Sequence, residues 1–121
     1  MITEAFLRDI SVILGNDRVL YDMQSRIRSS RDAYARWNVV PDTKIVDAVA
    51  FPSSTEEVVQ LVSLARSYSV PLVPRGGGTG LMGAAISRCG GLAIELKGLD
   101  QIFNINREDR TAQVQSGVIL E

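Results

Sequence analysis

Histidine is absent from this sequence of 121 residues, and cysteine occurs once, at Cys89. Without histidine, the chain by itself has no Ser-His-Asp or Cys-His catalytic group and lacks the usual ligand for zinc or non-haem iron. A single cysteine cannot form an internal disulfide or a cysteine metal cluster. We therefore predict no metal site in this chain, and we interpret Cys89 as a small packing residue beside a turn.

The sequence also lacks a large charge of one sign, because it has 13 basic and 14 acidic side chains and a net charge of -1. Nucleic-acid binding needs a basic field, so no nucleic-acid partner is expected. No apolar run approaches the roughly 20 residues that span a bilayer. The sequence after Met1 shows no basic segment followed by an apolar one, as a signal peptide would. We expect a cytoplasmic protein without a transmembrane segment.

Residues 1–44 are predicted to form an N-terminal helix followed by an arm. A threonine N-cap and apolar residues at helical spacing indicate an amphipathic helix over residues 3–14. From 17 to 42 the chain is polar and rich in arginine, which indicates short helical pieces. We interpret Tyr34 and Trp37 as aromatic anchors that pack this arm on the core.

Residues 45–121 alternate between strand and helix patterns and predict an α+β fold. Ser54 and Glu57 match a capping box that starts a helix after the first strand. Strand, helix and strand then make one βαβ unit, whose two strands we expect to pair in parallel. The expected elements are strands at 45–51, 70–74 and 91–96, a helix over 54–69, a β-hairpin over 102–106 and 111–115, and the start of a further helix at 117.

The most informative segment, residues 76–83, follows the second expected strand and has five glycines in eight residues. Glycine tolerates positive φ and leaves the backbone open to close approach, so successive N–H groups can converge on an anion. A short helix starting near Leu81 would add its own free N–H groups. Arg75, just before the loop, could add charge or only stabilise it. The pattern predicts a binding site for a diphosphate.

Two other nucleotide-binding motifs compete with this interpretation. The Walker A motif is absent, since no Lys-Ser or Lys-Thr pair follows the glycines. The segment 78–83 does match G-x-G-x-x-G of Rossmann domains, and Glu95 ends the next strand, where it would bind ribose hydroxyls. However, only about two helical turns fit before Gly90, and the glycines Gly76 and Gly77 have no role in that motif. A Rossmann-type NAD-binding fragment is the alternative.

Three segments together resemble the FAD-binding (PCMH-type) domain of the vanillyl-alcohol oxidase/p-cresol methylhydroxylase superfamily. They are 51–59 (FPSSTEEVV), 71–83 (PLVPRGGGTGLMG) and 91–96 (GLAIEL). Their order and spacing resemble the branch that contains the flavin-binding glycolate oxidase subunit and D-lactate dehydrogenase. The resemblance covers roughly residues 45–121. It implies the N-terminal half of such a domain, with a βαβ unit of short parallel strands and a β-hairpin, preceded by the N-terminal helix.

The same resemblance implies which residues touch the cofactor. The residues expected to hold the FAD pyrophosphate through main-chain groups are Arg75, Gly76, Gly77, Gly78, Thr79, Gly80, Leu81 and Gly83, with Pro74 shaping the approach and Gly117 and Val118 in a further cofactor-lining turn. Thr79 stands where some family members attach the flavin covalently to a histidine. Any FAD is therefore expected to be bound non-covalently through this loop.

The resemblance also implies a truncated fragment, because the family's flavin-ring wall and substrate domain have no counterpart in this sequence. We accordingly expect no catalytic residue here and no activity of the chain alone, whereas the whole enzyme would oxidise a 2-hydroxy acid such as glycolate or D-lactate. A non-catalytic interaction module is the alternative from another class. An incomplete domain leaves apolar strand edges that would self-associate or pair with a complementing chain.

Overall fold

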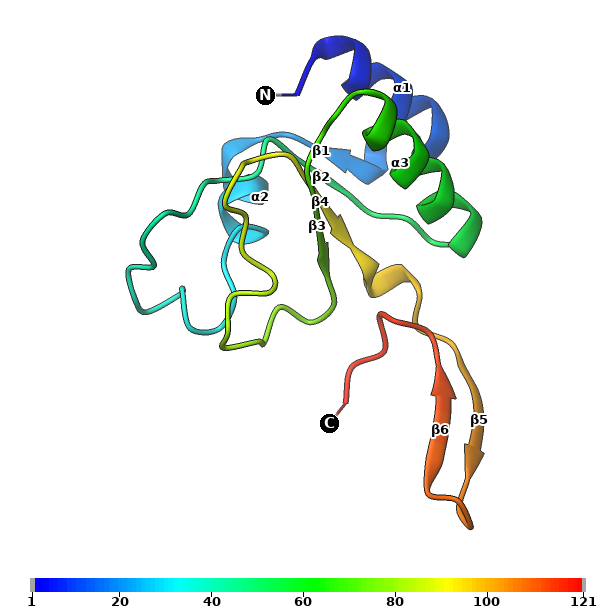
Figure 1. The fold of residues 1–121 in the computed structure, drawn as a ribbon. Coiled ribbons are helices and arrows are strands. Elements are labelled where there is room, and N and C mark those ends of the chain that lie inside the picture. The colour runs from blue at the N-terminus through cyan, green and yellow to red at the C-terminus, as the bar shows by residue number, and fades with distance from the viewer. Residues whose placement is uncertain (1, 121) are drawn as a thin grey trace.

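The computed structural model describes residues 2–120, and its core is a four-stranded sheet in the order β1-β2-β4-β3, with a separate two-stranded sheet, β5-β6 (Figure 1). The elements in chain order are α1 (Glu4–Leu14), η1 (Asn16–Arg18), β1 (Val19–Leu20), α2 (Met23–Arg28), β2 (Ala48–Ala50), α3 (Thr55–Ser67), β3 (Leu72–Arg75), β4 (Leu92–Glu95), η2 (Leu96–Gly98), β5 (Ile102–Asn106) and β6 (Thr111–Val114). This sheet of mostly parallel strands, with its helices and an appended antiparallel hairpin, confirms the predicted α+β fold class.

Helix α1 forms where its pattern predicts. The Thr3 hydroxyl accepts a hydrogen bond from the Phe6 N–H at 3.2 Å, and Gly15 ends the helix at a φ of 90°. Its apolar stripe, Phe6, Ile10 and Leu14, is buried against α3 and one face of the sheet. No helix in residues 2–120 is long and apolar enough to cross a membrane.

Helix α3 also begins at its predicted cap, but the cap differs in one bond. The Ser54 hydroxyl accepts from the Glu57 N–H at 3.2 Å, as a capping box requires. The Glu57 carboxylate accepts from the N–H of Ser53 at 2.7 Å, rather than from that of Ser54. It also forms a two-pronged ion pair with Arg18, both bonds measuring 2.8 Å. The same carboxylate therefore caps α3 and fastens the segment just before β1 to it.

The three parallel strands are arranged differently from the prediction. The β2-α3-β3 unit exists, but β4 lies between β2 and β3 and pairs with both in parallel. The predicted direct pairing of the first two strands is therefore wrong. The reason is apolar content: β4 is buried on both faces and takes the centre, whereas β3 contains Pro74, which cannot donate to a ladder and suits an edge.

The arm contributes more to the fold than predicted, and through different residues. Its strand β1, which the sequence interpretation missed, pairs antiparallel with β2. Tyr34 and Trp37 are 48% and 88% exposed, so the prediction that they anchor the arm is wrong. The arm is held instead by polar groups that are buried: Ser29, Ser30 and Asp32.

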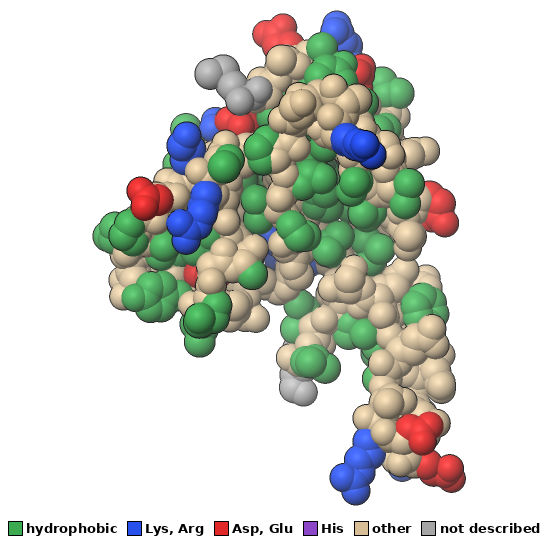
Figure 2. Space-filling view, viewed as in Figure 1, with side chains coloured by type: hydrophobic (Ala, Val, Ile, Leu, Met, Phe, Trp, Pro, Cys, Tyr) green, Lys and Arg blue, Asp and Glu red, His purple; other side chains and the backbone are tan. Residues whose placement is uncertain are grey.

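The hairpin β5–β6 projects from the body of the molecule (Figures 1 and 2). Its predicted strands are confirmed, with a turn in which the Asn106 side chain accepts from the N–H groups of Glu108 and Asp109. Every residue of β6 is exposed, and so are most residues of β5. The helix predicted from residue 117 is wrong as far as residue 120, because this segment forms a turn that packs against η2.

Candidate functional site

The glycine-rich loop leaves β3 at Gly76 and runs without helix or strand until β4. Gly78 and Gly83 have φ values of 68° and 81°, which explains the need for glycine at both positions. At Gly78 a Cβ would also lie 2.5 Å from the Arg75 guanidinium. The short helix predicted near Leu81 does not form, so no helix N-terminus contributes to this site. The loop itself carries the site.

The N–H groups of this loop are the feature that suits an anion. Within residues 2–120, those from Gly76 to Met82 donate no hydrogen bond to backbone or side chain. The next one, on Gly83, donates to Asp32 Oδ2 at 3.1 Å. Unbonded backbone donors are costly unless water or a ligand satisfies them. A run of free amides in a glycine loop is therefore a set of donors that fits a diphosphate.

A cavity of about 620 Å³ lies beside these amides, within the size range of small-molecule sites. Two predicted loop residues, Gly77 and Thr79, share it with the two residues of the predicted second turn, Gly117 and Val118. Residues about forty positions apart in the sequence thus meet in one hollow. The remaining lining residues are Lys97, Asp100, Ile102 and Ile119.

Gly117 sets the second wall of this cavity. A Cβ there would overlap the carbonyl oxygen of Leu96, and the Gly117 N–H donates to the carbonyl of Leu99 at 2.8 Å. This close contact presses the turn onto the segment that follows β4. At Gly77 a Cβ would lie 3.0 Å from Ile119 Cδ1, so the loop and the turn also approach each other closely. Glycine at 77 and 117 keeps the two walls at this separation.

Some of the other predicted site residues are exposed on the loop, and one of them stabilises the loop through buried contacts. Thr79, Gly80 and Leu81 are exposed, as is Pro74 near the end of β3. The Arg75 side chain is buried and donates to Glu95 Oε1 at 3.0 Å and to the Ala85 carbonyl at 2.8 Å. Of the two roles left open for Arg75, its side-chain contacts favour stabilising the loop.

Glu95 does not have the position that the Rossmann alternative needs. It is 5% exposed, and its Oε1 accepts from Ser29 Oγ at 2.7 Å as well as from Arg75. No helix connects the glycine loop to β4 among the described residues. Glu95 Oε2 is the one buried side-chain polar atom without a hydrogen-bond partner in residues 2–120. Glu95 also lines a small cavity of about 90 Å³.

The sequence interpretation missed several residues of the site region. Lys97 and Asp100 place one positive and one negative charge on the cavity wall. Their position next to a predicted strand end is the only sequence signal that could have indicated them. Asp32 had no signal, because its contact with Gly83 spans 51 positions. Cys89, predicted to pack beside a turn, is exposed.

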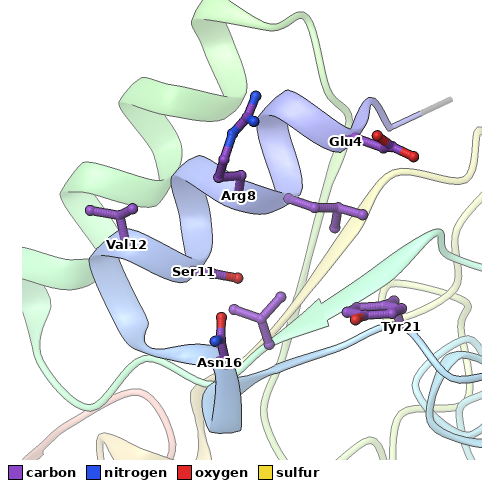
Figure 3. A pocket seen from close by; sticks show the side chains of 8 residues that line it. Glu4, Arg8, Ser11, Val12, Asn16 and Tyr21 are labelled. Atoms are coloured by element: carbon purple, nitrogen blue, oxygen red, sulfur yellow. The ribbon is translucent and has the colours of Figure 1, made fainter.

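A larger hollow of about 810 Å³ lies along the outer side of α1 (Figure 3). Glu4, Arg8, Ser11 and Val12 project from α1 around it, with Asn16 and Tyr21 on the segment below (Figure 3). No predicted site residue lines it. Size alone does not make it the better site, because the free amides border the smaller cavity.

Comparison with known proteins identifies the family. Residues 46–121 match the family described as "FAD binding domain", which is more than half of the chain. The chain is 34% identical over 119 residues to glycolate oxidase subunit GlcD of Bacillus subtilis (strain 168) and 32% identical over 119 residues to D-2-hydroxyglutarate dehydrogenase of Stutzerimonas stutzeri (strain A1501). These alignments cover 98% of this chain but 24% and 25% of the two relatives.

Solved structures share the fold. An alkyldihydroxyacetonephosphate synthase superimposes with a TM-score of 0.80 at 26% identity, over 98% of this chain and 23% of that one. A substrate-bound p-cresol methylhydroxylase gives 0.77 at 21% identity, over 97% and 23%, which supports the fold alone. The chain belongs to the FAD-binding domain family, of the PCMH type that its sequence resembles. It is homologous to the FAD-binding domains of flavin-dependent 2-hydroxy-acid dehydrogenases and oxidases, and it spans about a quarter of the length of the curated relatives it matches.

Proposed function

We propose that the glycine loop and the 117–119 turn hold the pyrophosphate of FAD without a covalent bond. The observation that carries this proposal is the run of unbonded N–H groups from Gly76 to Met82 beside a cavity that Gly117 and Val118 also line. These donors would bind the phosphate oxygens, as in other backbone nests. The Thr79 side chain has no nitrogen for a histidyl-type flavin link, so the loop would hold the cofactor by hydrogen bonds.

Isothermal titration of the chain with FAD, FMN, ADP and inorganic pyrophosphate tests this proposal. FAD and ADP share the diphosphate, so both should bind, in the micromolar range or more weakly, because the chain provides one part of the pocket. FMN, which has a single phosphate, should bind more weakly than either. No heat with FAD, ADP or pyrophosphate would contradict the proposal. NAD contains the same ADP unit, so the Rossmann alternative, which the comparisons do not support, requires NAD to bind more tightly than FAD in a parallel titration.

We further propose that the whole protein oxidises a 2-hydroxy acid, as the names of its relatives indicate for those proteins. FAD supplies the capacity to accept a hydride equivalent when it is bound. Residues 45–121 would anchor that cofactor, residues 1–44 would support it as an arm, and no residue of this chain would act on the substrate. Assay of the purified chain with glycolate, D-lactate and an electron-accepting dye should show no turnover.

We also propose that the exposed hairpin pairs with a further polypeptide, and with a second copy of the chain when no other is offered. A lone two-stranded hairpin is at best marginally stable, and Ile102, Phe103 and Ile105 are all more than half exposed on β5. Light scattering should show a concentration-dependent dimer that Ile105→Lys weakens. A clean monomer would contradict this.

We also propose that the protein is cytoplasmic. Cell fractionation tests this.

A further inference from the structure

We infer that Asp32 is a positioning residue for the cofactor loop: its carboxylate holds the loop in the form that leaves the N–H groups of 76–82 free. The inference rests on the proposed function of that loop. It assigns a binding role to the arm, which lies outside the matched residues 46–121 and outside the predicted site. Figure 1 shows the arm and the loop side by side at the lower left.

The contacts of Asp32 divide between its two oxygens. Oδ1 accepts from the Ala35 N–H at 2.8 Å, which closes a turn within the arm. Oδ2 accepts from the Gly83 N–H at 3.1 Å, which joins the arm to the loop. The side chain is fully buried, at 0% exposure. A buried carboxylate is costly unless it is hydrogen-bonded, so both contacts are needed to keep it there.

Two further contacts flank this bond and bring the same part of the arm to the loop. The Ala33 N–H donates to the Gly80 carbonyl at 3.2 Å, and Arg75 Nη2 donates to the Arg31 carbonyl at 3.1 Å. Residues 31–33 therefore meet the loop at its start, its middle and near its end. All three contacts use loop groups other than the free N–H groups.

Preorganisation is the physical benefit of this arrangement. A glycine-rich segment loses more backbone entropy on ordering than any other, and a ligand that must order it binds less tightly. The contact through Gly83 fixes the position where φ is 81°, directly after the run of free donors. An Asp32 clamp would move that entropy cost from ligand binding to folding.

The negative charge of Asp32 allows a positioning role to be distinguished from a direct electrostatic effect on the ligand. Asp32 is an anion close to the proposed site of another anion, so its direct effect on a diphosphate is repulsive. Removing the charge should tighten binding if electrostatics dominate. It should weaken binding if positioning dominates. The sign of one affinity change therefore decides between the two.

Asp32→Asn is the variant of choice, with Asp22→Asn as its matched control. An asparagine can keep the bond from Ala35 with its one amide oxygen, but then turns its NH₂ donor toward the Gly83 N–H. Asp22 lies in the same arm as the N-cap of α2, and asparagine is an equally good N-cap. The control thus removes the same charge without touching the loop.

The experiment measures the affinities for ADP and FAD by titration, at a temperature where circular dichroism shows that both variants are folded. It also measures backbone amide exchange of the unliganded chain. For Asp32→Asn we expect about tenfold weaker binding, equal to about 1.4 kcal/mol, and faster exchange at Gly83. Asp22→Asn should leave both unchanged. Equal or tighter binding by Asp32→Asn would overturn the inference.

Amide exchange on the unchanged chain keeps the test decisive if Asp32→Asn does not fold. The Gly83 amide should then be protected, whereas those of Thr79 and Gly80, which are exposed, should exchange rapidly. Equal exchange rates at Gly83 and Gly80 would overturn the inference. A chain that binds neither FAD nor ADP would contradict the proposed function. The protection of the Gly83 amide would still test its contact with Asp32 separately.

Discussion

The Arg75 guanidinium donates to the carbonyl oxygen of Ala85 at 2.8 Å, across ten positions of the chain. One side chain therefore closes the base of the glycine loop, while its Nε bonds to Glu95 on the central strand. The positive charge that precedes the loop is thus used within the fold. Attraction for a diphosphate must come from the loop amides and from Lys97 on the cavity wall.

Replacement of Arg75 by lysine tests this closing role. Lysine keeps the charge but lacks the planar fork that reaches Glu95, Ala85 and Arg31 together. We expect a loss of about 2–3 kcal/mol in the free energy of unfolding, since buried acceptors are left without donors. Urea denaturation measures it. A loss below about 0.5 kcal/mol, the range of ordinary surface changes, would show that the guanidinium is dispensable.

Gly117→Ala should damage the second wall of the cavity. The added methyl group would overlap the Leu96 carbonyl, so the turn must move away from η2. We expect about 1–3 kcal/mol of destabilisation, as for other overpacking changes, and a loss of ADP binding. Gly80→Ala is the control, because its methyl group would meet no atom within 4 Å and its φ is not positive. If both variants have the same stability, the close contact at Gly117 is unimportant.

Lys97→Gln should weaken the binding of pyrophosphate. The ammonium group lines the proposed diphosphate cavity and is exposed, so the expected effect is modest, about threefold at low salt. The effect should shrink as ionic strength rises. Lys44→Gln, the only other lysine in the sequence, is the control and should leave the affinity unchanged. A salt-independent effect of Lys97→Gln would point to a structural cause.

The acid stability of the fold should depend on Glu57. Hydrogen bonds from Arg18, followed by those from Ser53, lower the pKa of its carboxyl from 4.5 to about 2. A lowered pKa means that the ionised form is favoured by folding, so this stabilisation is complete above the ordinary pKa and is lost as the pH falls toward 2. Urea midpoints of Glu57→Gln should therefore lie below those of the unchanged chain at about pH 5 and converge with them near pH 2.

The neighbouring Glu56→Gln variant controls for the loss of a negative charge at the start of α3. Glu56 is exposed in the same helical turn, and the Arg18 ion pair does not involve it. Its midpoints should differ from those of the unchanged chain by nearly the same small amount at both pH values. A difference that grows with pH to the same extent as that of Glu57→Gln would assign the effect to the helix dipole instead of the ion pair.

The parts of this fold that could be predicted from the sequence are those that local chemistry determines. The caps of α1 and α3, the hairpin and the glycine loop are each determined by residues that are close together in the sequence. The position of β4 could not be predicted in this way, because strand order depends on which strand is buried on both faces. The role of Asp32 was hidden for a similar reason, since its partner lies 51 positions away.

Some residues that line the candidate cavity were predicted from the sequence, but the contacts that shape it were not. Glycines at 77 and 117 were assigned to the cofactor, and both line one cavity. The expected helix at Leu81 was wrong because the segment up to Cys89 is occupied by turns, and its ends bond to the arm. The resemblance indicated where the phosphates would bind, whereas the contacts that shape the loop came from tertiary packing.

The most direct test of the central claim is an amide-resolved NMR titration of the chain with ADP. Donors that bind a diphosphate must change their chemical shifts as the ligand is added. We predict saturable shifts at the backbone N–H groups of residues 76–82 and at 117–118, with little change in the hairpin turn at 106–110. Shifts confined to other regions, or none in 76–82 at saturating ADP, would contradict the account.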